Sequence, residues 1–575
     1  MAAQLPIPLY TTLADAFPTS DIALKHAARF NDLAQEFEHR FGHKPTYIAR
    51  APGRVNLIGE HIDYALFGVF PTAIEQDIII ACAPHEPSTR DPGHVNAHNV
   101  TPKYVPQSFT PMLRRRADSI AKQEKQEEEE QGNLYLESDW HLDIDKRELR
   151  WESYVKAGYY GVLNNYFSAS STSGVHPKPA DILVTGNVPP GSGVSSSAAM
   201  VVASTLAFLA VNGKLEQQGN GLTKGKLVSM AVENEKRVGV NSGGMDQAAS
   251  ILGTANSALY ISFYPSLAAE LVTLPTTIPG TKEEEAVFVI TNSLVVSDKV
   301  VGAKTRYNLR VVETLLAARL LAIHLSLPAS FYESTVTPNR PTLREVVSAF
   351  ILQYYSGATE PVPEKELENG LEMFLDMVEV LKGETVREAM GFPQPEDESE
   401  QGLKIEEIIK ASGMDEATFR EVYLSWVDVE ATYFQLYKRT RHIITESLRV
   451  LEFRDLCLAA SNAPSSGSNI STLEALGSLM NGSQESCSKL YECSCPELDQ
   501  LTRICRESGA LGSRLSGAGW GGCAVSLVPA SEVTTFIQSV KERYPGYQGL
   551  SEEKLNEAIF ATRPASGAFV YKLTE

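Results

Sequence analysis

The chain of 575 residues is too long for one ordinary hydrophobic core, so at least two domains are expected. Its formal net charge of −20 and its pI near 5.1 argue against nucleic acid and anionic membranes as natural partners, because an acidic surface repels phosphate groups. The seven cysteines are odd in number and widely spread, which does not fit a disulfide framework.

Three features bear on the location of the protein. The first 17 residues have no basic stretch and no long apolar stretch, so no signal peptide is expected. The longest apolar stretch of helical character, residues 198–211, is shorter than the roughly 20 residues that span a membrane. Cys493 and Cys495 stand one residue apart without a nearby histidine, which favours structural thiols over a metal site. We therefore expect a reducing, cytoplasmic location.

Short apolar segments rich in β-branched residues predict strands along the whole chain. They are residues 78–83 (IIIACA), 182–185 (ILVT), 287–291 (VFVIT), 524–528 (AVSLV) and 568–573 (AFVYKL). Residues 305–323 have apolar side chains at helical spacing and contain neither Pro nor Gly, which predicts a helix. Because strands and helices alternate in both halves, the sequence predicts an α+β (mixed α/β) protein of two lobes, residues 1–290 and residues 291–575.

Two acidic segments have the composition of surface insertions. Residues 122–132 (KQEKQEEEEQG), within an insertion of about residues 114–132, contain no apolar side chain and indicate a solvated segment. Residues 392–402 (FPQPEDESEQG) combine proline with acidic residues and indicate a loop.

A polar motif occupies residues 51–64 (APGRVNLIGEHIDY). Arg54 is suited to holding a phosphate or a developing negative charge. Glu60, His61 and Asp63 are suited to a ligand rich in hydroxyl groups, because each carboxylate accepts several hydrogen bonds. A purely structural interpretation, in which Arg54 pairs with Glu60, stays open at this point.

A glycine- and serine-rich loop reads NVPPGSGVSSSAA at residues 187–199. Gly191 and Gly193 let the backbone turn tightly and approach an anion closely. The serines at 195–197 precede a strongly helix-forming segment, so free N–H groups and the helix dipole favour a phosphate there. A simple helix cap is the alternative, but a cap needs one serine and not three. The loop does not end in the Gly-Lys-Ser/Thr of a Walker A motif.

Two further glycine-rich stretches carry less information. Residues 243–247 (GGMDQ) place Asp246 on a tight turn, where it could cap a helix or act as a base. Residues 515–527 (LSGAGWGGCAVSL) hold four glycines in six residues ahead of a predicted strand. That pattern fits either a flexible turn or a ligand wall lined by backbone.

The motifs at residues 51–64, 189–199 and 515–524 resemble, in order and spacing, the three motifs of the GHMP kinases. The GEHIDY ending of the first motif resembles the galactokinase signature. The segment VGVNSGGMDQAAS at residues 238–250 resembles the branch that holds fungal galactokinases and animal N-acetylgalactosamine kinases. The resemblance extends in patches from about residue 50 to the C-terminus. It implies two mixed α/β lobes with ATP and a sugar in the cleft between them.

The resemblance also implies a role for each matching residue. Asp246 would take the proton from the sugar C1 hydroxyl, and Arg54 would orient Asp246 and stabilise charge at the transferred phosphoryl group. The sugar would be held by Arg54, Glu60, His61, Asp63, Gly243, Asp246 and Tyr307. The nucleotide would be held by Trp151, Gly191, Ser192, Gly193, Ser195, Ser196 and Ser197, with Trp151 near the adenine. Ser197 and Glu235 would bind Mg²⁺. One departure is visible, because Ala65 and Leu66 follow the Asp-Tyr pair where many relatives have Asn-Gly.

The reaction implied by the resemblance is transfer of the ATP γ-phosphoryl group to the C1 oxygen of α-D-galactose, giving galactose 1-phosphate and ADP. The alternatives are an N-acetylgalactosamine kinase, a mevalonate-type kinase, and a protein that binds sugar and ATP and then a transcriptional repressor, with or without kinase activity. The complete SSSAA segment favours a kinase over a pure sensor. The polar residues Glu60, His61 and Asp63 fit a sugar better than a lipid precursor. A monomer is expected.

Overall fold

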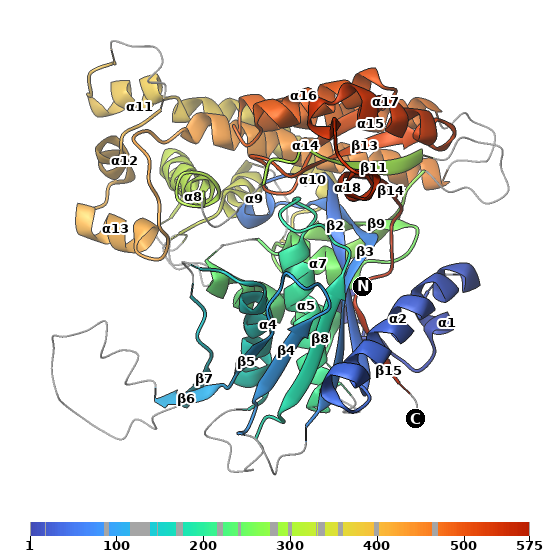
Figure 1. Cartoon of the computed structure of the whole chain (residues 1–575). Coiled ribbons are helices and arrows are strands. Elements are labelled where there is room, and N and C mark those ends of the chain that lie inside the picture. The colour runs from blue at the N-terminus through green and yellow to red at the C-terminus, as the bar shows by residue number, and fades with distance from the viewer. Residues whose placement is uncertain are drawn as a thin grey trace, which may run out of the picture.

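The computed structural model describes most of the chain (Figure 1). The described residues are 2–17, 19–85, 91–115, 138–145, 148–167, 176–215, 222–239, 243–275, 286–296, 302–328, 331, 340–354, 360–395, 402–462 and 470–573. The acidic residues 122–132 lie outside them, as do residues 396–401 of the second acidic segment, so both insertions stay predictions.

The larger sheet has seven strands in the order β1-β15-β2-β3-β8-β4-β5. Their bounds are Leu9–Tyr10 (β1), Tyr47–Ile58 (β2), Phe70–Pro84 (β3), Val95–Asn99 (β4), Gln107–Phe109 (β5), Ala180–Gly186 (β8) and Phe569–Lys572 (β15). The central strands β2, β3 and β8 are buried along almost their whole length, which explains their apolar sequences. β15 pairs antiparallel with β2, so the C-terminal end of the chain completes the sheet of the N-terminal half.

Successive strand residues point to opposite faces of this sheet, and apolar side chains occur on both faces. Helices therefore cover both faces. Ile78 and Ile80 of β3 belong to the main core, on the side of α4 (Trp151–Tyr166) and α5 (Ser196–Val211). Ile79 belongs to a smaller core under α2 (Ser20–Phe41) on the other side. The short α1 (Leu13–Ala16) packs beside α2, while α6 (Lys224–Glu235) and α7 (Met245–Leu252) pack against α5 (Figure 1).

The upper part of the molecule in Figure 1 contains a second sheet, with the antiparallel strand order β12-β13-β11-β14. Its strands are Ala286–Asn292 (β11), Gly512–Ser516 (β12), Cys523–Pro529 (β13) and Ile559–Thr562 (β14). The helices that pack on it include Pro496–Glu507 (α16), Val533–Arg543 (α17), Glu552–Ala558 (α18) and Ile470–Lys489 (α15), the last of which packs against β12.

A group of helices completes this part of the chain. They are Tyr307–His324 (α8), Leu343–Tyr354 (α9), Glu364–Met377 (α10), Gly383–Met390 (α11), Ile405–Ser412 (α12), Glu416–Leu424 (α13), Leu436–Asn462 (α14) and Ile470–Lys489 (α15). Two strand pairs stand apart from both large sheets: Met112–Arg115 (β6) with Ser138–His141 (β7), and Ser257–Ser262 (β9) with Ala268–Thr273 (β10).

The elements predicted from the sequence are confirmed. The predicted strands correspond to β3, β8, β11, β13 and β15, and the predicted helix corresponds to α8. The mixed α/β class with two lobes is confirmed as well, while the lobe boundary at residue 290 stays a prediction. Within the described part of the chain, no helix combines the length and the apolar character that a membrane crossing needs.

Candidate active site

Arg54 and Asp246 form a buried ion pair at the centre of the candidate site. Arg54, in β2, donates from Nε to Asp246 Oδ1 at 2.8 Å, and its Nη2 lies 2.6 Å from the same oxygen. Its Nη1 donates to the carbonyl oxygen of Gly193 at 2.6 Å. One guanidinium therefore joins a carboxylate to the glycine-serine loop. Arg54 has Asp246 as its ion-pair partner, and Glu60 has Arg514.

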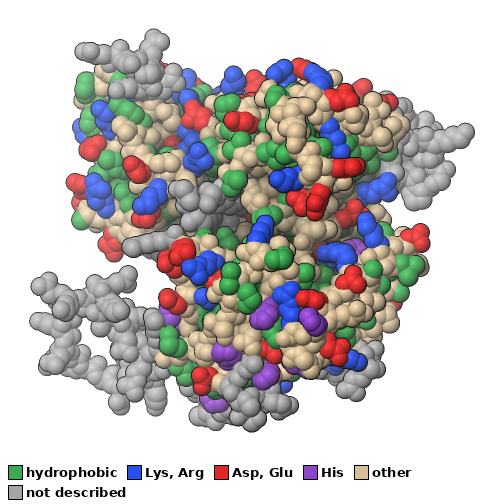
Figure 2. Space-filling model, viewed as in Figure 1, with side chains coloured by type: hydrophobic (Ala, Val, Ile, Leu, Met, Phe, Trp, Pro, Cys, Tyr) green, Lys and Arg blue, Asp and Glu red, His purple; other side chains and the backbone are tan. Residues whose placement is uncertain are grey.

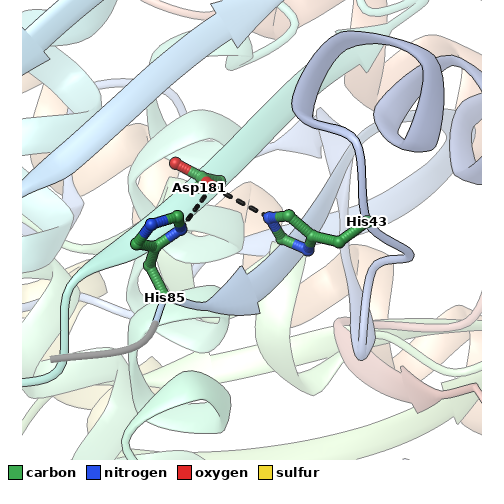
Figure 3. Close-up of side chains that lie close together, drawn as sticks. All are labelled: His43, His85 and Asp181. Carbon is green, nitrogen blue, oxygen red and sulfur yellow. Dashed lines mark hydrogen bonds and ion pairs between the residues drawn. The ribbon is translucent and has the colours of Figure 1, made fainter. Parts of the chain in front are cut away.

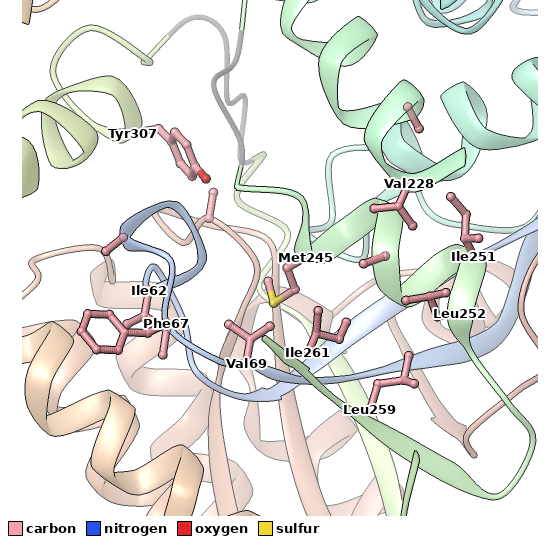
Figure 4. Close-up of a cluster of buried hydrophobic side chains, with 14 of the residues drawn as sticks. Ile62, Phe67, Val69, Val228, Met245, Ile251, Leu252, Leu259, Ile261 and Tyr307 are labelled. Atoms are coloured by element: carbon pink, nitrogen blue, oxygen red, sulfur yellow. The ribbon is translucent and has the colours of Figure 1, made fainter. Parts of the chain in front are cut away.

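Asp246 lies on the first turn of α7, where a negative charge is favoured by the helix dipole. The N-cap position belongs to Gly244, which has a φ of 109°, so Asp246 is not the capping residue. Met245, beside Asp246, belongs to the buried cluster that also contains Val69 and Ile261 (Figure 4). Ser250 Oγ donates to the carbonyl oxygen of Pro52 at 2.6 Å, which ties α7 to β2.

Residues 59–64 form a turn at the end of β2, and its polar groups reach the C-terminal half of the chain. Glu60 Oε2 accepts hydrogen bonds from the Gly517 N–H at 3.0 Å and from Arg514 Nη2 at 3.2 Å. His61 Nε2 lies 2.8 Å from the carbonyl oxygen of Ala518, and its Nδ1 lies 3.0 Å from the Tyr64 hydroxyl. Burial raises the pKa of Glu60, although Arg514 and Arg54 oppose this rise.

α14 supports the backbone of this turn from behind. Glu446 Oε1 accepts from the Gly59 N–H at 2.9 Å and from the Glu60 N–H at 3.3 Å, and His442 Nε2 lies 3.0 Å from the Glu60 carbonyl oxygen. Burial alone would raise the pKa of Glu446, but the positive charges of Arg449 and Arg514 outweigh it and lower the pKa to about 2. The turn therefore rests on a carboxylate that is ionised at neutral pH.

Asp63, Gly243 and Tyr307 lie beside the ion pair. The pKa of Asp63 is raised to about 6, chiefly by burial and next by the negative charge of Asp246. A Cβ on Gly243 would lie 2.6 Å from Asp63 Cγ, so no larger residue fits there without movement. The ring of Tyr307, at the start of α8, has its centroid 5.4 Å from that of His61. Burial, followed by the charges of Asp63 and Asp246, raises the pKa of Tyr307 well above its usual value.

The glycine-serine loop ends at α5. Gly191 and Gly193 have φ values of 68° and 80°, which glycine adopts without strain. Ser195 has a φ of 60° and makes no side-chain capping hydrogen bond. Its Oγ is buried and has no hydrogen-bond partner within the described part of the chain. A buried hydroxyl without a partner costs free energy, so this geometry fits a bound ligand better than a simple cap.

Two of the four glycines in residues 515–527, Gly517 and Gly522, pack directly against this loop. A Cβ on Gly517 would lie 2.5 Å from the carbonyl oxygen of Gly193, and one on Gly522 would lie 2.9 Å from that of Ser192. Both glycines have positive φ values, 94° and 78°. This stretch is therefore a tightly packed support for the loop.

The remaining predicted residues lie on the surrounding helices, except Ser192, which lies in the glycine-serine loop. Ser196 and Ser197 are the first two residues of α5, and Ser192 Oγ donates to the Pro189 carbonyl oxygen at 2.6 Å. Glu235, at the end of α6, accepts a hydrogen bond from Gln247 Nε2 at 2.5 Å. Gln247 follows Asp246 directly in the chain, so Glu235 lies near the ion pair. Trp151 is the first residue of α4, where its indole N–H donates to the Val105 carbonyl oxygen at 3.2 Å. Its place near an adenine stays a prediction.

Sequence reasoning missed the residues that support the turn from the C-terminal half, chiefly His442, Glu446 and Arg514. The only available signal for Arg514 was its place directly before the glycine-rich stretch, in RLSGAG. The departure at residues 65–66 leaves Leu66 with a φ of 68°, a conformation that glycine or asparagine adopts more easily. Cys493 is a buried free thiol and Cys495 a half-buried one, and their interpretation as structural residues stays a prediction.

A cavity of about 740 Å³ lies apart from this site, between α11 and the start of α14. Its lining includes Leu381, Arg387, Phe434 and Tyr437, and it contains none of the predicted site residues.

Comparison with family models defines the class of the protein. The model of the N-terminal domain of GHMP kinases matches residues 154–254, and the model of their C-terminal domain matches residues 464–546. The two-lobed fold and the glycine-serine loop are thus those of a GHMP kinase. A third model, the galactokinase galactose-binding signature, matches residues 35–84, which include the 59–64 turn.

The chain belongs to the galactokinase family. It is 36% identical to a galactokinase of Dictyostelium discoideum, over 95% of this chain and 94% of that protein. It is 34% identical to a galactokinase of Saccharomyces cerevisiae, over 95% of each chain. Among solved structures, the Lactococcus lactis galactokinase complexed with galactose has the same fold, with a TM-score of 0.57 and 21% identity over 94% of this chain and 99% of that one.

Proposed function

We propose that the protein transfers the γ-phosphoryl group of ATP to the C1 hydroxyl of α-D-galactose, giving galactose 1-phosphate and ADP. The observation that carries this proposal is the buried Arg54–Asp246 pair, joined through Gly193 to a loop whose buried Ser195 hydroxyl has no partner among the residues that the structure describes. The pair puts a proton acceptor and a phosphate loop at one point. The galactokinase relatives, aligned over nearly the whole chain, support galactose as the acceptor.

Asp246 accepts the proton of the C1 hydroxyl as that oxygen bonds to the transferred phosphorus, and ADP leaves with the bridging oxygen. Transition states of this kind are mostly loose, with negative charge spread over the equatorial oxygens, so positioning and electrostatics supply most of the rate increase. Arg54 suits both tasks, because its side chain holds the Asp246 carboxylate and its positive charge lies beside the loop.

The sugar contacts we propose are those of Glu60, His61, Asp63, Gly243 and Tyr307. Carboxylates that are buried and partly compensated accept hydrogen bonds from hydroxyl groups strongly, because little water competes with them. Glu60 is held in place by Arg514 and by the Gly517 N–H, and this fixes the direction in which it can accept.

MgATP is the proposed donor. The backbone of residues 191–196 and the free end of α5 suit the phosphates. Ser197 and Glu235 offer the oxygen ligands that Mg²⁺ prefers, and Mg²⁺ would neutralise charge on the phosphate oxygens. The orphaned Ser195 hydroxyl also fits a phosphate-bearing ligand.

The test is ADP release by the purified chain with MgATP and a panel of hexoses that includes galactose, N-acetylgalactosamine and glucose. We expect galactose to have the highest kcat/KM and the product to carry phosphate at C1, seen by phosphorus NMR. A higher kcat/KM for N-acetylgalactosamine would contradict the assignment of the sugar. Absence of turnover with every hexose would contradict catalysis and favour the sensor alternative, to be examined by repressor pull-down with sugar and ATP.

The cytoplasm is the proposed location. All seven cysteines are free thiols, and six of them are buried. Free thiols persist in a reducing compartment, which supports this proposal.

A further inference from the structure

Three side chains converge on one carboxylate group, as Figure 3 shows. They lie at the end of the seven-stranded sheet opposite to the end that carries Arg54. His43 lies between α2 and β2, His85 directly follows β3, and Asp181 lies on β8. His43 Nε2 lies 3.0 Å and His85 Nδ1 lies 3.1 Å from the same atom, Asp181 Oδ2. The three atoms all lie within 4.8 Å of one another.

This cluster is remote from the reacting groups. Arg54 pairs with Ala73 in β3, and His85 comes twelve residues after Ala73. At roughly 3.3 Å per residue, that distance corresponds to about 40 Å of extended strand. The cluster therefore needs a role other than phosphoryl transfer.

We propose that His43, His85 and Asp181 bind one Zn²⁺ ion. Two imidazole nitrogens and one carboxylate oxygen form a donor set typical of zinc, whereas Mg²⁺ and Ca²⁺ prefer oxygen ligands throughout. Tetrahedral zinc with ligands at about 2.0–2.1 Å places those ligands about 3.3 Å apart. The two nitrogen–oxygen distances of 3.0 and 3.1 Å are close to that separation.

The hydrogen bonds around the cluster also suit a cation. His43 Nδ1 lies 3.3 Å from the Lys44 carbonyl oxygen. When Nδ1 carries the proton and donates to this oxygen, the Nε2 lone pair faces a carboxylate oxygen, and a cation between them removes the repulsion. Asn96 Nδ2 donates to the other carboxylate oxygen, Asp181 Oδ1, at 2.7 Å. Such outer hydrogen bonds orient the ligands of zinc sites.

The site is open to solvent. The His43 and His85 side chains are 34% and 27% exposed, while Asp181 is 2% exposed. Histidine side chains gather on the lower part of the N-terminal lobe in Figure 2. An ion can therefore enter without unfolding of the lobe, and a water molecule can occupy the fourth position.

Bound zinc would join three segments that are far apart in the chain. α2 packs on the sheet through a small separate core that includes Phe30, Leu33 and Phe37. The ion would fasten the end of this helix to β3 and β8. Because the unfolded chain lacks the site, zinc at about 100 times its Kd would raise the folding equilibrium constant about 100-fold.

The test uses the purified full-length chain, freed of metal with a chelator and desalted. Titration with Zn²⁺ in a calorimeter should show one strong site per chain, with a Kd in the micromolar range or below. Co²⁺ should give the intense visible absorption of tetrahedral coordination. Zn²⁺ should raise the melting temperature and slow hydrogen exchange in α2, with kcat unchanged.

Matched variants separate this site from other metal-binding groups. His43→Ala and His85→Ala should each lower zinc affinity at least 100-fold and remove the Co²⁺ absorption. Asn96→Ala should lower the zinc affinity less, about 10–100-fold, because Asn96 orients the ligand Asp181 without binding the ion itself. His39→Ala is the control, because His39 lies nearby on α2 with an 81% exposed side chain and should bind zinc as the wild type does.

Equal zinc affinity and stoichiometry in the wild type, His43→Ala and His85→Ala would overturn the proposal, as would a wild type without a strong site. Where an alanine variant is poorly folded by circular dichroism, His43→Gln and His85→Gln replace it, since glutamine keeps the size and polarity of the side chain. Binding by these variants that matches the wild type would equally contradict the zinc site.

Discussion

The 59–64 turn and the glycine-serine loop both lie against the Arg54–Asp246 pair, yet different forces hold them. The turn rests on charged side chains from the other lobe, above all Glu446 and Arg514. The loop rests on close backbone contacts with Gly517 and Gly522, and its Ser195 hydroxyl has no hydrogen-bond partner among the described residues.

This difference follows from what each region is proposed to bind. A sugar offers uncharged hydroxyl groups, so its binding site needs fixed acceptors, and fixed acceptors in a buried place need compensating positive charge. A nucleotide brings its own negative charge, so its loop needs free N–H and O–H groups, and packing can fix the backbone without using them. Substitution of a supporting charged residue should therefore weaken galactose binding. Addition of a side chain at a supporting glycine should weaken the use of MgATP.

Removal of the shared base should have the largest effect. Asp246→Ala should lower kcat by about 10²–10⁴-fold, because a positioned base contributes about this much. Asp246→Asn is the matched variant, since it keeps the shape and loses the proton acceptor, and it should show a similar loss. Steady-state assay with galactose and MgATP measures the effect. Turnover of Asp246→Asn near that of the wild type would refute the role of Asp246.

Added volume should damage the nucleotide side selectively. In Gly517→Ala, the new Cβ would lie 2.5 Å from the Gly193 carbonyl oxygen and push the loop. We expect kcat/KM for MgATP to fall about 10²-fold, as a misplacement of roughly 1 Å can cost that much. Gly549→Ala is the control, because Gly549 has a φ of 79° but no atom within 4 Å of its Cβ position. Equal activity of the two variants would show that packing does not hold the loop.

Loss of a buried charge should damage the sugar side. Glu446→Gln should lower the free energy of unfolding by about 3 kcal/mol near neutral pH, because it leaves nearby positive charge uncompensated. It should also raise KM for galactose about tenfold or more and change KM for MgATP less. Glu507→Gln is the control, because it removes a charge from an exposed ion pair. It should change neither the free energy of unfolding nor the KM for galactose.

The pH dependence gives a further check on Glu446. Its pKa of about 2 in the folded protein lies below the value of 4.5 that it has when unperturbed. Its contribution is therefore fully present above pH 4.5 and is lost as the pH falls towards 2. The difference in unfolding free energy between wild type and Glu446→Gln should shrink over that range in denaturant titrations. A difference that does not depend on pH would exclude a charge effect.

Asp63 should make stability depend on pH in the opposite direction, and by a smaller amount. Its pKa is about 6 in the folded protein, against 3.8 when unperturbed, so the folded state binds an extra proton between these values. Its burial should therefore lower stability as the pH rises from about 4 to about 6. Asp63→Asn should remove this loss, and its stability relative to the wild type should increase over that range by up to about 3 kcal/mol. Asp32→Asn, at an exposed position, should follow the wild type.

Much of the candidate site could be predicted from the sequence, because its parts have local signals. Gly191 and Gly193 mark a tight turn before a helix, and the order of polar residues from Arg54 to Asp63 is visible in one short motif. The supporting residues could not be found this way. Glu446 and His442 stand on the long helix α14 without a local motif around them, and only their position behind Glu60 gives them a role.

The sequence by itself determined five of the strands, the α8 helix and the three glycine-rich stretches, since these depend on side-chain periodicity and on the conformational freedom of glycine over a few residues. Only the tertiary structure decided which charges meet. Arg54 pairs with a carboxylate 192 positions away, and Arg514 pairs with one 454 positions away. It also brought together His43, His85 and Asp181. The physical reason is that local propensity acts along the chain, whereas the partner of a buried charge depends on which surfaces pack together.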